Sequence, residues 1–360
     1  MARRLLVLRA GSGPGNTLMR SLKAGAPSLF IVGCNDDRFA LKKSPANRNY
    51  LLPFSERAEF GDALIELIKA ERIDLVLPTN DVDVKRISDL RDSIACGVFL
   101  PRKAVIKRCQ DKYQLTTFLR RRGLPVPLTY PVTTLRDIER LFRRLGPSRQ
   151  VWCRIRKGTG SFGAILVGSP RQARNWIRCW EDVGGVPAAS FTLSEYLPGR
   201  DFSVQSLWKE GRLIMARAHE RVSYFVAGGG PSTVSSQAAL ARIVDEPEVI
   251  EVGTKVIRAL DARASGTFFV DIKENASGQP CVTEINAGRF SSVSLVHDLA
   301  GPDNMTLAYV RAALGGPAGA RRARRARKPG ETCYVLRDLD TLPAFVWSDD
   351  LFEGIEDARG

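Results

Sequence analysis

The sequence contains only two histidines, and its seven cysteines include no Cys-x-x-Cys pair. A metal site built on a cluster of histidines is therefore excluded, and a Ser-His-Asp triad has little support. The cysteines are widely scattered, and several lie in apolar, strand-like runs, such as Cys153 in VWCRI and Cys281 in PCVTEI. This pattern favours reduced thiols in a core over disulfides or a zinc site.

Long apolar runs are also missing, because no stretch approaches the ~20 residues that a membrane-spanning helix needs. The N-terminal MARRLLVLRAGSG begins as a signal peptide does, with arginines before an apolar stretch. That stretch ends at Arg9 and passes into a glycine loop, whereas the apolar region of a signal peptide runs for about 7–15 residues. We therefore predict a buried first strand, no membrane segment and a cytoplasmic protein.

Acidic residues are outnumbered, with 39 Asp and Glu against 54 Lys and Arg, and the net charge is +15. The basic run RRARRARK (321–328) and the acidic tail after it cancel each other, so residues 1–320 carry the excess. A basic body suits anionic ligands, either nucleotide phosphates or nucleic acid. Because the basic run lacks interleaved aromatic residues, we interpret it as a solvated loop and expect no nucleic-acid partner.

Strand and helix patterns alternate over the first hundred residues. Apolar runs at 5–8, 29–33 and 74–78 read as buried strands. Helical patterns lie between them at 16–24 and 58–71. Strands separated by helices predict a parallel sheet covered on its two faces, and ligands usually bind at the ends of such strands.

The rest of the chain mixes helices with antiparallel strands. We predict helices at 111–122, 136–145, 170–181 and about 237–260, a linker at 123–127, strands at 150–155, 163–167 and 191–197, and strand pairs at 202–208 with 212–218 and 266–274 with 279–286. The helix at 237–260 is expected to be interrupted near Pro247.

The hairpin of 266–286 carries the strongest chemical signal. Asp271 lies in the middle of one apolar strand, while Glu284 and Asn286 end its partner two residues apart and so share a face. A carboxylate in an apolar strand is costly to bury unless it is paired or bound to a metal. Three oxygen ligands suit Mg²⁺, whereas ordinary polar strand-end residues are the alternative.

A glycine loop joins two strands in VWCRIRKGTGSFGAILV (151–167). Its glycines let backbone N–H groups approach a phosphate closely. Arg154 and Arg156 alternate with apolar residues, so we expect them to share a face and hold phosphate oxygens. The segment is not a Walker A loop, since no Gly-Lys-Ser/Thr follows, and a flexible hairpin tip is the alternative.

A third segment, SEYLPGRDFSV (194–204), leaves one strand through Pro198-Gly199 and enters another at Phe202. The N–H and C=O groups of such a segment can bind the edge of adenine. Taken alone, it is only a strand, a turn and a strand.

The order of these three parts resembles that of ATP-grasp enzymes, over roughly residues 1–345. The likeness is greatest to the branch similar to the large subunit of carbamoyl phosphate synthase and to the amino-acid ligase of pyrrolysine biosynthesis. The segments GSGPGNTLMRSLKAG, DLVLPTND and CQDKYQLTTFLRRRGLPVP carry that likeness.

The resemblance implies an α/β ATP-grasp fold with a Rossmann-like N-terminal domain, a small mobile lid and a C-terminal α+β lobe built on an antiparallel sheet. The implied boundaries are 1–106 for the N-terminal domain, 107–316 for the ATP-grasp domain (lid about 125–195, C-terminal lobe about 196–316), 317–330 for a basic exposed loop and 331–360 for a C-terminal strand and acidic tail.

The resemblance also implies roles in a Mg–ATP site. These are Lys112 and Arg154 at the phosphates, Gly158, Gly160, Ser161 and Gly163 in the lid loop, Glu195, Tyr196 and Leu197 in the adenine hinge, Asp201 at the ribose, Asp271, Glu284 and Asn286 at Mg²⁺, and Arg289 at the transferred phosphoryl group. The chain departs from the family in having Arg154 where many relatives have lysine, and Gly228-Gly-Gly230 in a region with no histidine.

The activity implied by the resemblance is ligation of a carboxylate to an amine or thiol, with ATP and Mg²⁺ or Mn²⁺, through an acyl phosphate. The expected partners are a small carboxylate, such as an amino acid, an amine and a second copy of the chain. Arg217, Arg221 and the loop 228–233 are candidates for holding the acceptor carboxylate.

The sequence leaves three alternatives to this activity. One is phosphorylation of carbamate or bicarbonate, and another is a non-catalytic protein that binds ATP or nucleic acid. A dinucleotide-dependent oxidoreductase fits less well, because Asn16 occupies the third glycine position of G-x-G-x-x-G.

Overall fold

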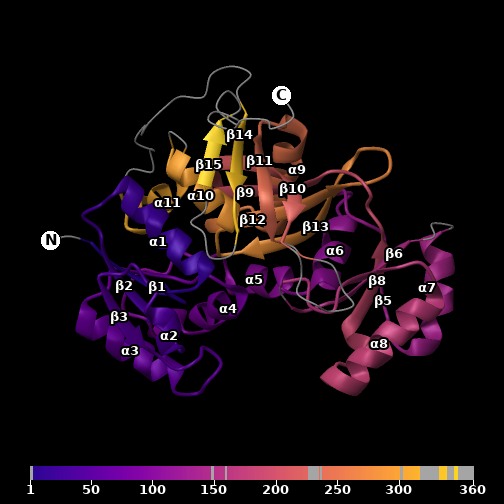
Figure 1. Ribbon diagram of the computed structural model, residues 1–360, viewed down its shortest axis with the longest axis horizontal. Coiled ribbons are helices and arrows are strands. Elements are labelled where there is room, and N and C mark those ends of the chain that lie inside the picture. The colour runs from indigo at the N-terminus through magenta and orange to yellow at the C-terminus, as the bar shows by residue number, and fades with distance from the viewer. Residues whose placement is uncertain are drawn as a thin grey trace, which may run out of the picture.

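The computed structural model describes residues 3–146, 150–158, 160–225, 235, 237–300, 303–316, 332–338 and 344–347. The loop 228–233, the basic run 321–328 and most of the acidic tail lie outside these ranges. Among the described residues, the strands form three sheets (Figure 1). No helix in this part of the chain is both long and apolar enough to cross a bilayer.

The N-terminal sheet is parallel, with strand order β3-β2-β1-β4, and confirms the predicted α/β arrangement. Its strands are β1 (Arg4–Leu8), β2 (Phe30–Asn35), β3 (Arg48–Leu51) and β4 (Leu75–Leu77), and its helices are α1 (Gly13–Gly25), α2 (Arg38–Leu41), α3 (Phe60–Glu71) and α4 (Asp81–Asp89). Ser12 caps α1 by accepting from the N–H of Gly15. The helices α2 and α4 and the edge strand β3 were not predicted.

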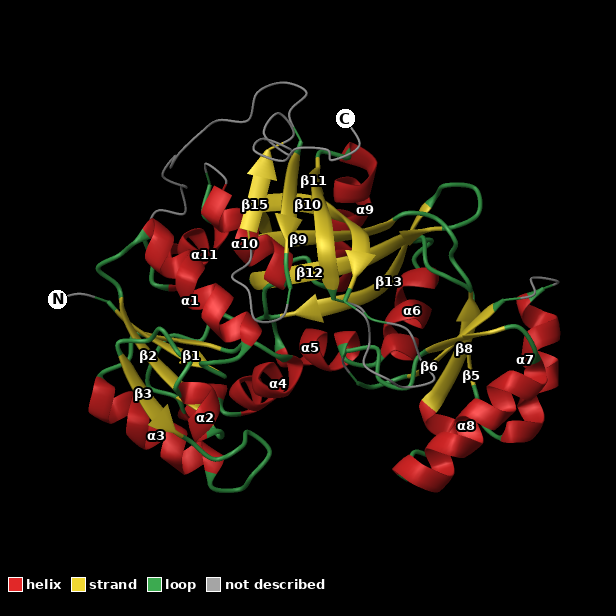
Figure 2. Cartoon of the chain, viewed as in Figure 1, coloured by secondary structure: helices red, strands yellow, loops and turns green. Residues whose placement is uncertain are grey.

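A second, smaller sheet has the order β5-β8-β6-β7 and carries its own core. Its elements are β5 (Thr129–Pro131), α7 (Ile138–Leu145), β6 (Val151–Ile155), β7 (Ile165–Val167), α8 (Pro170–Gly184) and β8 (Phe191–Glu195). Helices α7 and α8 pack with this sheet as a separate lobe, at the right of Figure 2. We call this lobe the lid.

The third sheet is antiparallel, with the order β13-β12-β9-β10-β11-β14-β15. Its strands are β9 (Asp201–Lys209), β10 (Arg212–Tyr224), β11 (Ala238–Val244), β12 (Gly266–Glu274), β13 (Pro280–Ala287), β14 (Cys333–Leu336) and β15 (Ala344–Trp347), and its helices are α9 (Pro247–Leu260), α10 (Ser292–Ala300) and α11 (Met305–Ala313). We call it the large sheet.

One predicted helix is partly wrong. The helical pattern of 237–260 holds only from Pro247 onward, where α9 begins, and residues 238–244 form β11 instead. Strand β10 offers a free backbone edge that Ala238–Val244 pairs with, and β14 pairs on its other side. These hydrogen bonds between strands outweigh the weak helical preference of an alanine-rich segment.

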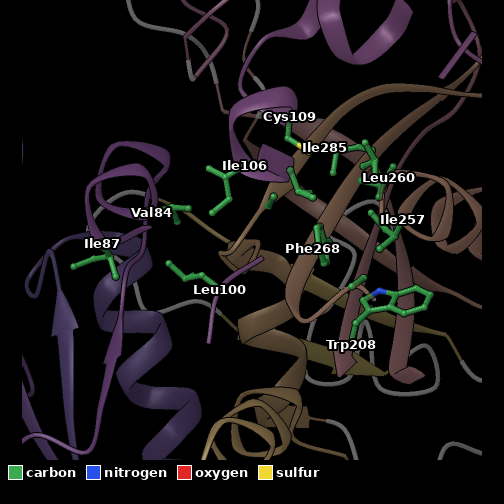
Figure 3. Close-up of a cluster of buried hydrophobic side chains, with 14 of the residues drawn as sticks. Val84, Ile87, Leu100, Ile106, Cys109, Trp208, Ile257, Leu260, Phe268 and Ile285 are labelled. Atoms are coloured by element: carbon green, nitrogen blue, oxygen red, sulfur yellow. The ribbon is translucent and has the colours of Figure 1, made fainter. Parts of the chain in front are cut away.

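Two short helices, α5 (Lys103–Cys109) and α6 (Lys112–Arg120), connect the N-terminal sheet to the large sheet. Figure 3 shows Val84 and Ile87 of α4 beside Leu100, Ile106 and Phe268 in one buried cluster. Because this cluster continues from α3 to β13 without a break, the N-terminal sheet and the large sheet share one core.

This shared core makes a stability prediction. Phe268→Ala removes a fully buried ring and should lower the free energy of unfolding by about 3–5 kcal/mol. Phe39→Ala is the matched control, because the Phe39 side chain on α2 is 80% exposed, and it should change stability little. Urea unfolding followed by circular dichroism measures both, and equal effects would contradict the assignment of the core.

Candidate nucleotide and metal site

Strands β12 and β13 bring the three predicted metal ligands together. Asp271 lies opposite Glu284 in the strand register, and a bulge follows Asp271. Asn286, two residues further along β13, donates from Nδ2 to Asp271 Oδ2 at 3.3 Å. Among the described residues no three His, Cys, Asp or Glu side chains cluster as metal ligands, so this candidate site consists of two carboxylates and one amide. All three are the hard oxygen donors that Mg²⁺ prefers.

Arg221 of β10 already supplies a positive charge to these residues. Its guanidinium donates to Asp271, and to Asp201 Oδ1 at 2.8 Å. Tyr224 donates from its hydroxyl to Asp201 Oδ2 at 2.6 Å. Burial disfavours the charged form of Arg221, but Asp271 and Asp201 outweigh burial and raise the pKa of the guanidinium.

The expectation that Arg217 and Arg221 hold an acceptor carboxylate is not supported by these contacts. Arg221 joins the residues expected at the ribose and at the metal. Arg217 donates to Ser294 Oγ at 2.9 Å and to the buried Asp298, and so binds α10 to the large sheet. The carboxylates that flank each arginine hold it in place, and the strand pattern alone did not reveal them.

Arg289 is fixed from two sides. Its Nε and one terminal nitrogen donate to the two oxygens of Asp81 at 2.7 and 2.9 Å, and that terminal nitrogen also donates to Asn286 Oδ1 at 2.6 Å. The guanidinium also stacks over the ring of Phe269. Burial opposes the charge of Arg289, but Asp81 raises its pKa, so the side chain stays a rigid cation. Asp81 ends the segment DLVLPTND, and its place just after a buried strand was the sequence signal that could have marked it as a site residue.

Lys112 and Arg154 reach Glu284 from different elements. Lys112 Nζ lies 3.5 Å from Glu284 Oε1 and donates to the carbonyl oxygen of Gly158 at 2.6 Å. Arg154 lies 3.9 Å from Glu284 Oε2 and donates to the carbonyl oxygen of Thr283. Burial lowers the pKa of Arg154, and its Nε has no partner among the described residues. A bound anion would satisfy that donor.

Arg154 and Arg156 contact different elements, and their common role at a phosphate stays a prediction. Strand β6 ends at Ile155, and the N–H of Arg156 still donates to the carbonyl oxygen of Ser190 at 2.8 Å. The guanidinium of Arg156 donates to Asp111 Oδ2 at 2.8 Å, across the start of α6. Arg154 alone points to β13.

The lid loop follows β6 and turns through left-handed backbone. Gly160, Ser161 and Gly163 have φ of 67°, 61° and 68°, and Gly158 has φ of 152°. A Cβ on Gly163 would lie 2.4 Å from Ile155 Cδ1, so this glycine permits the loop to pack closely. Thr159 lies outside the described residues.

The hinge after β8 leaves backbone groups available. Glu195 Oε2 accepts from the N–H of Leu128 at 3.1 Å, which fixes the end of β8. Tyr196 lies under the ammonium of Lys273, and the side chain of Leu197 is buried. In the described part of the chain, the N–H and C=O of Leu197 take part in no backbone hydrogen bond, as expected of groups that bind a base.

A cavity of about 830 Å³ opens beside the candidate metal ligands Glu284 and Asn286. Lys112, Gly158, Glu284 and Asn286 line one part of it, and α4 and α5 line another. The hinge residues 195–197 do not line it. Two of the three metal candidates thus lie in the wall of this cavity, and its volume is in the range of small-molecule sites.

No protein-family model matches this sequence. Solved structures, however, share its architecture. An L-amino acid ligase from Bacillus licheniformis has a TM-score of 0.70 at 13% identity, covering 93% of this chain and 79% of that one. A carboxyaminoimidazole ribonucleotide synthase from Aspergillus clavatus, crystallised with ATP, has a TM-score of 0.68 at 16% identity, covering 93% of this chain and 81% of that one.

The biotin carboxylase domain of a 2-oxoglutarate carboxylase from Hydrogenobacter thermophilus, crystallised with MgADP, ADP and bicarbonate, has a TM-score of 0.71 at 13% identity. The match covers 94% of this chain and 74% of that one. The chain thus has the ATP-grasp fold, as its resemblance predicted.

Replacing Arg221 tests the charge balance of the site. Arg221→Leu leaves Asp201 and Asp271 without their common cation and should cost about 3–5 kcal/mol of unfolding free energy. Arg212→Leu is the control, because Arg212 is an exposed arginine at the start of the same strand. Mg²⁺ should recover part of the lost thermal stability of Arg221→Leu, and equal stability of the two variants would contradict the pairing.

Proposed function

We propose that this chain is an ATP- and Mg²⁺-dependent ligase that joins a small carboxylate to an amine or a thiol and releases ADP and phosphate. The observation that carries the proposal is the meeting of Asp271, Glu284 and Asn286 with Lys112 and Arg154. The chain also shares its fold with an L-amino acid ligase and with enzymes crystallised with ATP or MgADP.

The residues present fit a magnesium ion. Asp271, Glu284 and Asn286 offer oxygen ligands, and Arg221 and Arg289 already donate to two of them as cations do. The bound ion would neutralise charge on the β- and γ-phosphates. Mn²⁺ has the same preference for oxygen and is an alternative.

The hinge and Asp201 are proposed to hold the nucleoside. The backbone of Leu197 would bind the adenine edge, beside Glu195 and Tyr196. Asp201 would bind ribose hydroxyls, since its carboxylate is already oriented by Arg221 and Tyr224.

The chemistry needs little beyond position and charge. In the proposed reaction, a carboxylate oxygen of the acceptor attacks the γ-phosphorus of ATP, ADP leaves, and an acyl phosphate forms. The amine or thiol then attacks the acyl carbon and phosphate leaves. Lys112, Arg154 and Arg289 would stabilise the transferred phosphoryl group, and the rigid setting of Arg289 against Asp81 suits that role.

The lid loop would keep water from the acyl phosphate. Gly158, which lines the cavity, is followed by a turn through Gly160, Ser161 and Gly163, and Lys112 donates to the carbonyl oxygen of Gly158. Closure of such a loop over the nucleotide protects a reactive intermediate from hydrolysis.

Phosphorylation of bicarbonate or carbamate is the second candidate, because a biotin carboxylase domain crystallised with bicarbonate has the same fold. The cavity of about 830 Å³ is far larger than bicarbonate needs and favours a larger acceptor.

A cytoplasmic location and a homodimer belong to the proposal as well. The non-catalytic, nucleic-acid-binding alternative depends on the run 321–328, which lies outside the described residues.

An ADP-release screen across pairs of amino acids, with a bicarbonate arm, tests the function. Glu284→Gln should lower ADP formation by about a hundredfold or more, because it removes the negative charge and one of the two oxygen donors of a metal ligand without changing its shape. Glu248→Gln on the exposed start of α9 is the matched control and should behave as wild type.

Three outcomes separate the candidates. Turnover with amino-acid pairs supports the ligase, and turnover with bicarbonate alone supports the second candidate. If no amino-acid pair and no bicarbonate gives any ADP, the non-catalytic binding protein is favoured. Full turnover by Glu284→Gln would mean that the metal site is misplaced.

A further inference from the structure

One wall of the cavity is strongly basic. Lys85 and Arg86 of α4 and Lys103 and Lys107 of α5 all line it. Among the described residues, α4 and α5 contribute two carboxylates to the lining of this cavity. These are Asp81, at the start of α4, and Asp89. Asp89 already binds both Lys85 at 2.9 Å and Lys103 at 2.5 Å. Among the described residues, Arg86 and Lys107 have no carboxylate within ion-pair distance.

Asp81 does not reduce this excess of positive charge. Both oxygens of Asp81 accept from Arg289, so the negative charge of Asp81 is balanced by an arginine beside the candidate metal ligands. We refer to the surface formed by Lys85, Arg86, Ser88, Lys103 and Lys107 as the basic wall.

Two buried polar groups on the basic wall lack partners. Ser88 is only 6% exposed, and its hydroxyl has no hydrogen-bond partner among the described residues. The Nε of Arg86 is likewise buried and unpaired. Leaving such a group unsatisfied costs about 1–3 kcal/mol, and both groups can donate. An oxygen acceptor within reach of either group would satisfy it.

The basic wall lies beyond the place expected for the phosphates of ATP. A nucleotide that extends from the hinge to the metal ligands places its phosphates near Lys112 and Glu284, at one part of the cavity. From Asp81 to Ser88, α4 advances by about 10 Å at the usual rise per residue. The positive charge of the wall is therefore left for the acceptor.

We propose that the basic wall binds a second anionic group of the acceptor, a carboxylate or a phosphate, several bonds away from the carboxylate that is phosphorylated. This inference rests on the proposed function and narrows its substrate class to small dianions. The wall also orients the acceptor, because its anionic tail on α4 and α5 directs the reacting end toward Arg289 and Asn286.

Direct binding tests the subsite apart from turnover. Two pairs of probes differ only in the second anion: adipate against hexanoate, and O-phospho-L-homoserine against L-homoserine. Isothermal titration calorimetry is run without nucleotide and again with Mg–ADP. The dianion of at least one pair should bind about tenfold or more tightly than its partner, and the preferred pair identifies the tail as carboxylate or phosphate.

Variants locate the binding. Lys103→Gln/Lys107→Gln neutralises two exposed lysines of the wall and should weaken the dianion about tenfold while leaving its neutral-tailed partner unchanged. Ser88→Ala should weaken it too. Lys69→Gln, on the exposed face of α3 and outside the cavity, is the matched control and should bind as wild type does.

The proposal is overturned if neither dianion binds below about 10 mM, if the paired probes bind equally, or if the double variant binds the dianion as wild type does. These outcomes stand apart from those of the ADP-release screen. ADP formation with no preference for charged acceptors would leave the ligase intact and remove the subsite. Binding of a dianion at the basic wall without any ADP formation would support the anion subsite and count against the ligase activity.

Discussion

The pairing of Asp271 with Arg221 is the interaction on which the site depends. Burial of Asp271, in the middle of a strand of the large sheet, raises the pKa of its carboxyl, and the charge of Arg221 opposes that rise. Arg221 acts from β10, across the intervening strand β9, and it binds Asp201 at the same time. The residues proposed for the ribose and for the metal are therefore held by one guanidinium before any ligand arrives.

A second ion pair connects this site to the rest of the molecule. Arg289 follows β13, and Asp81 begins α4 on the N-terminal sheet, so their bidentate contact joins the two sheets at the edge of the cavity. The shared apolar cluster lies directly beneath, with Val84 and Ile87 on the buried face of α4. The same helix presents Lys85, Arg86 and Asp89 to the cavity, so one element contributes to both the cavity and the core.

The sequence predicted more of the fold than of the contacts. Period-two and helical patterns located most strands and helices, and E-x-N opposite Asp271 located the metal candidates, because these signals are local. Residues 238–244 were assigned wrongly because only the edge of β10, distant in the chain, makes them a strand. The roles of Arg217, Arg221 and Arg156 depend on carboxylates 20 to 81 residues away, at Asp201, Asp271, Asp298 and Asp111, and no local pattern reports such partners.

The separate core of the lid has a consequence for how the molecule opens. The N-terminal sheet and the large sheet share buried clusters, so neither can part from the other without exposing apolar surface, whereas the lid's cluster contains only its own residues. Cooperative units of a protein follow such boundaries. Amide protons of the lid strands should accordingly exchange as one group, at an opening free energy below that of the remaining strands. The lobe with the most independent core is also the one that carries the glycine loop proposed to close over ATP.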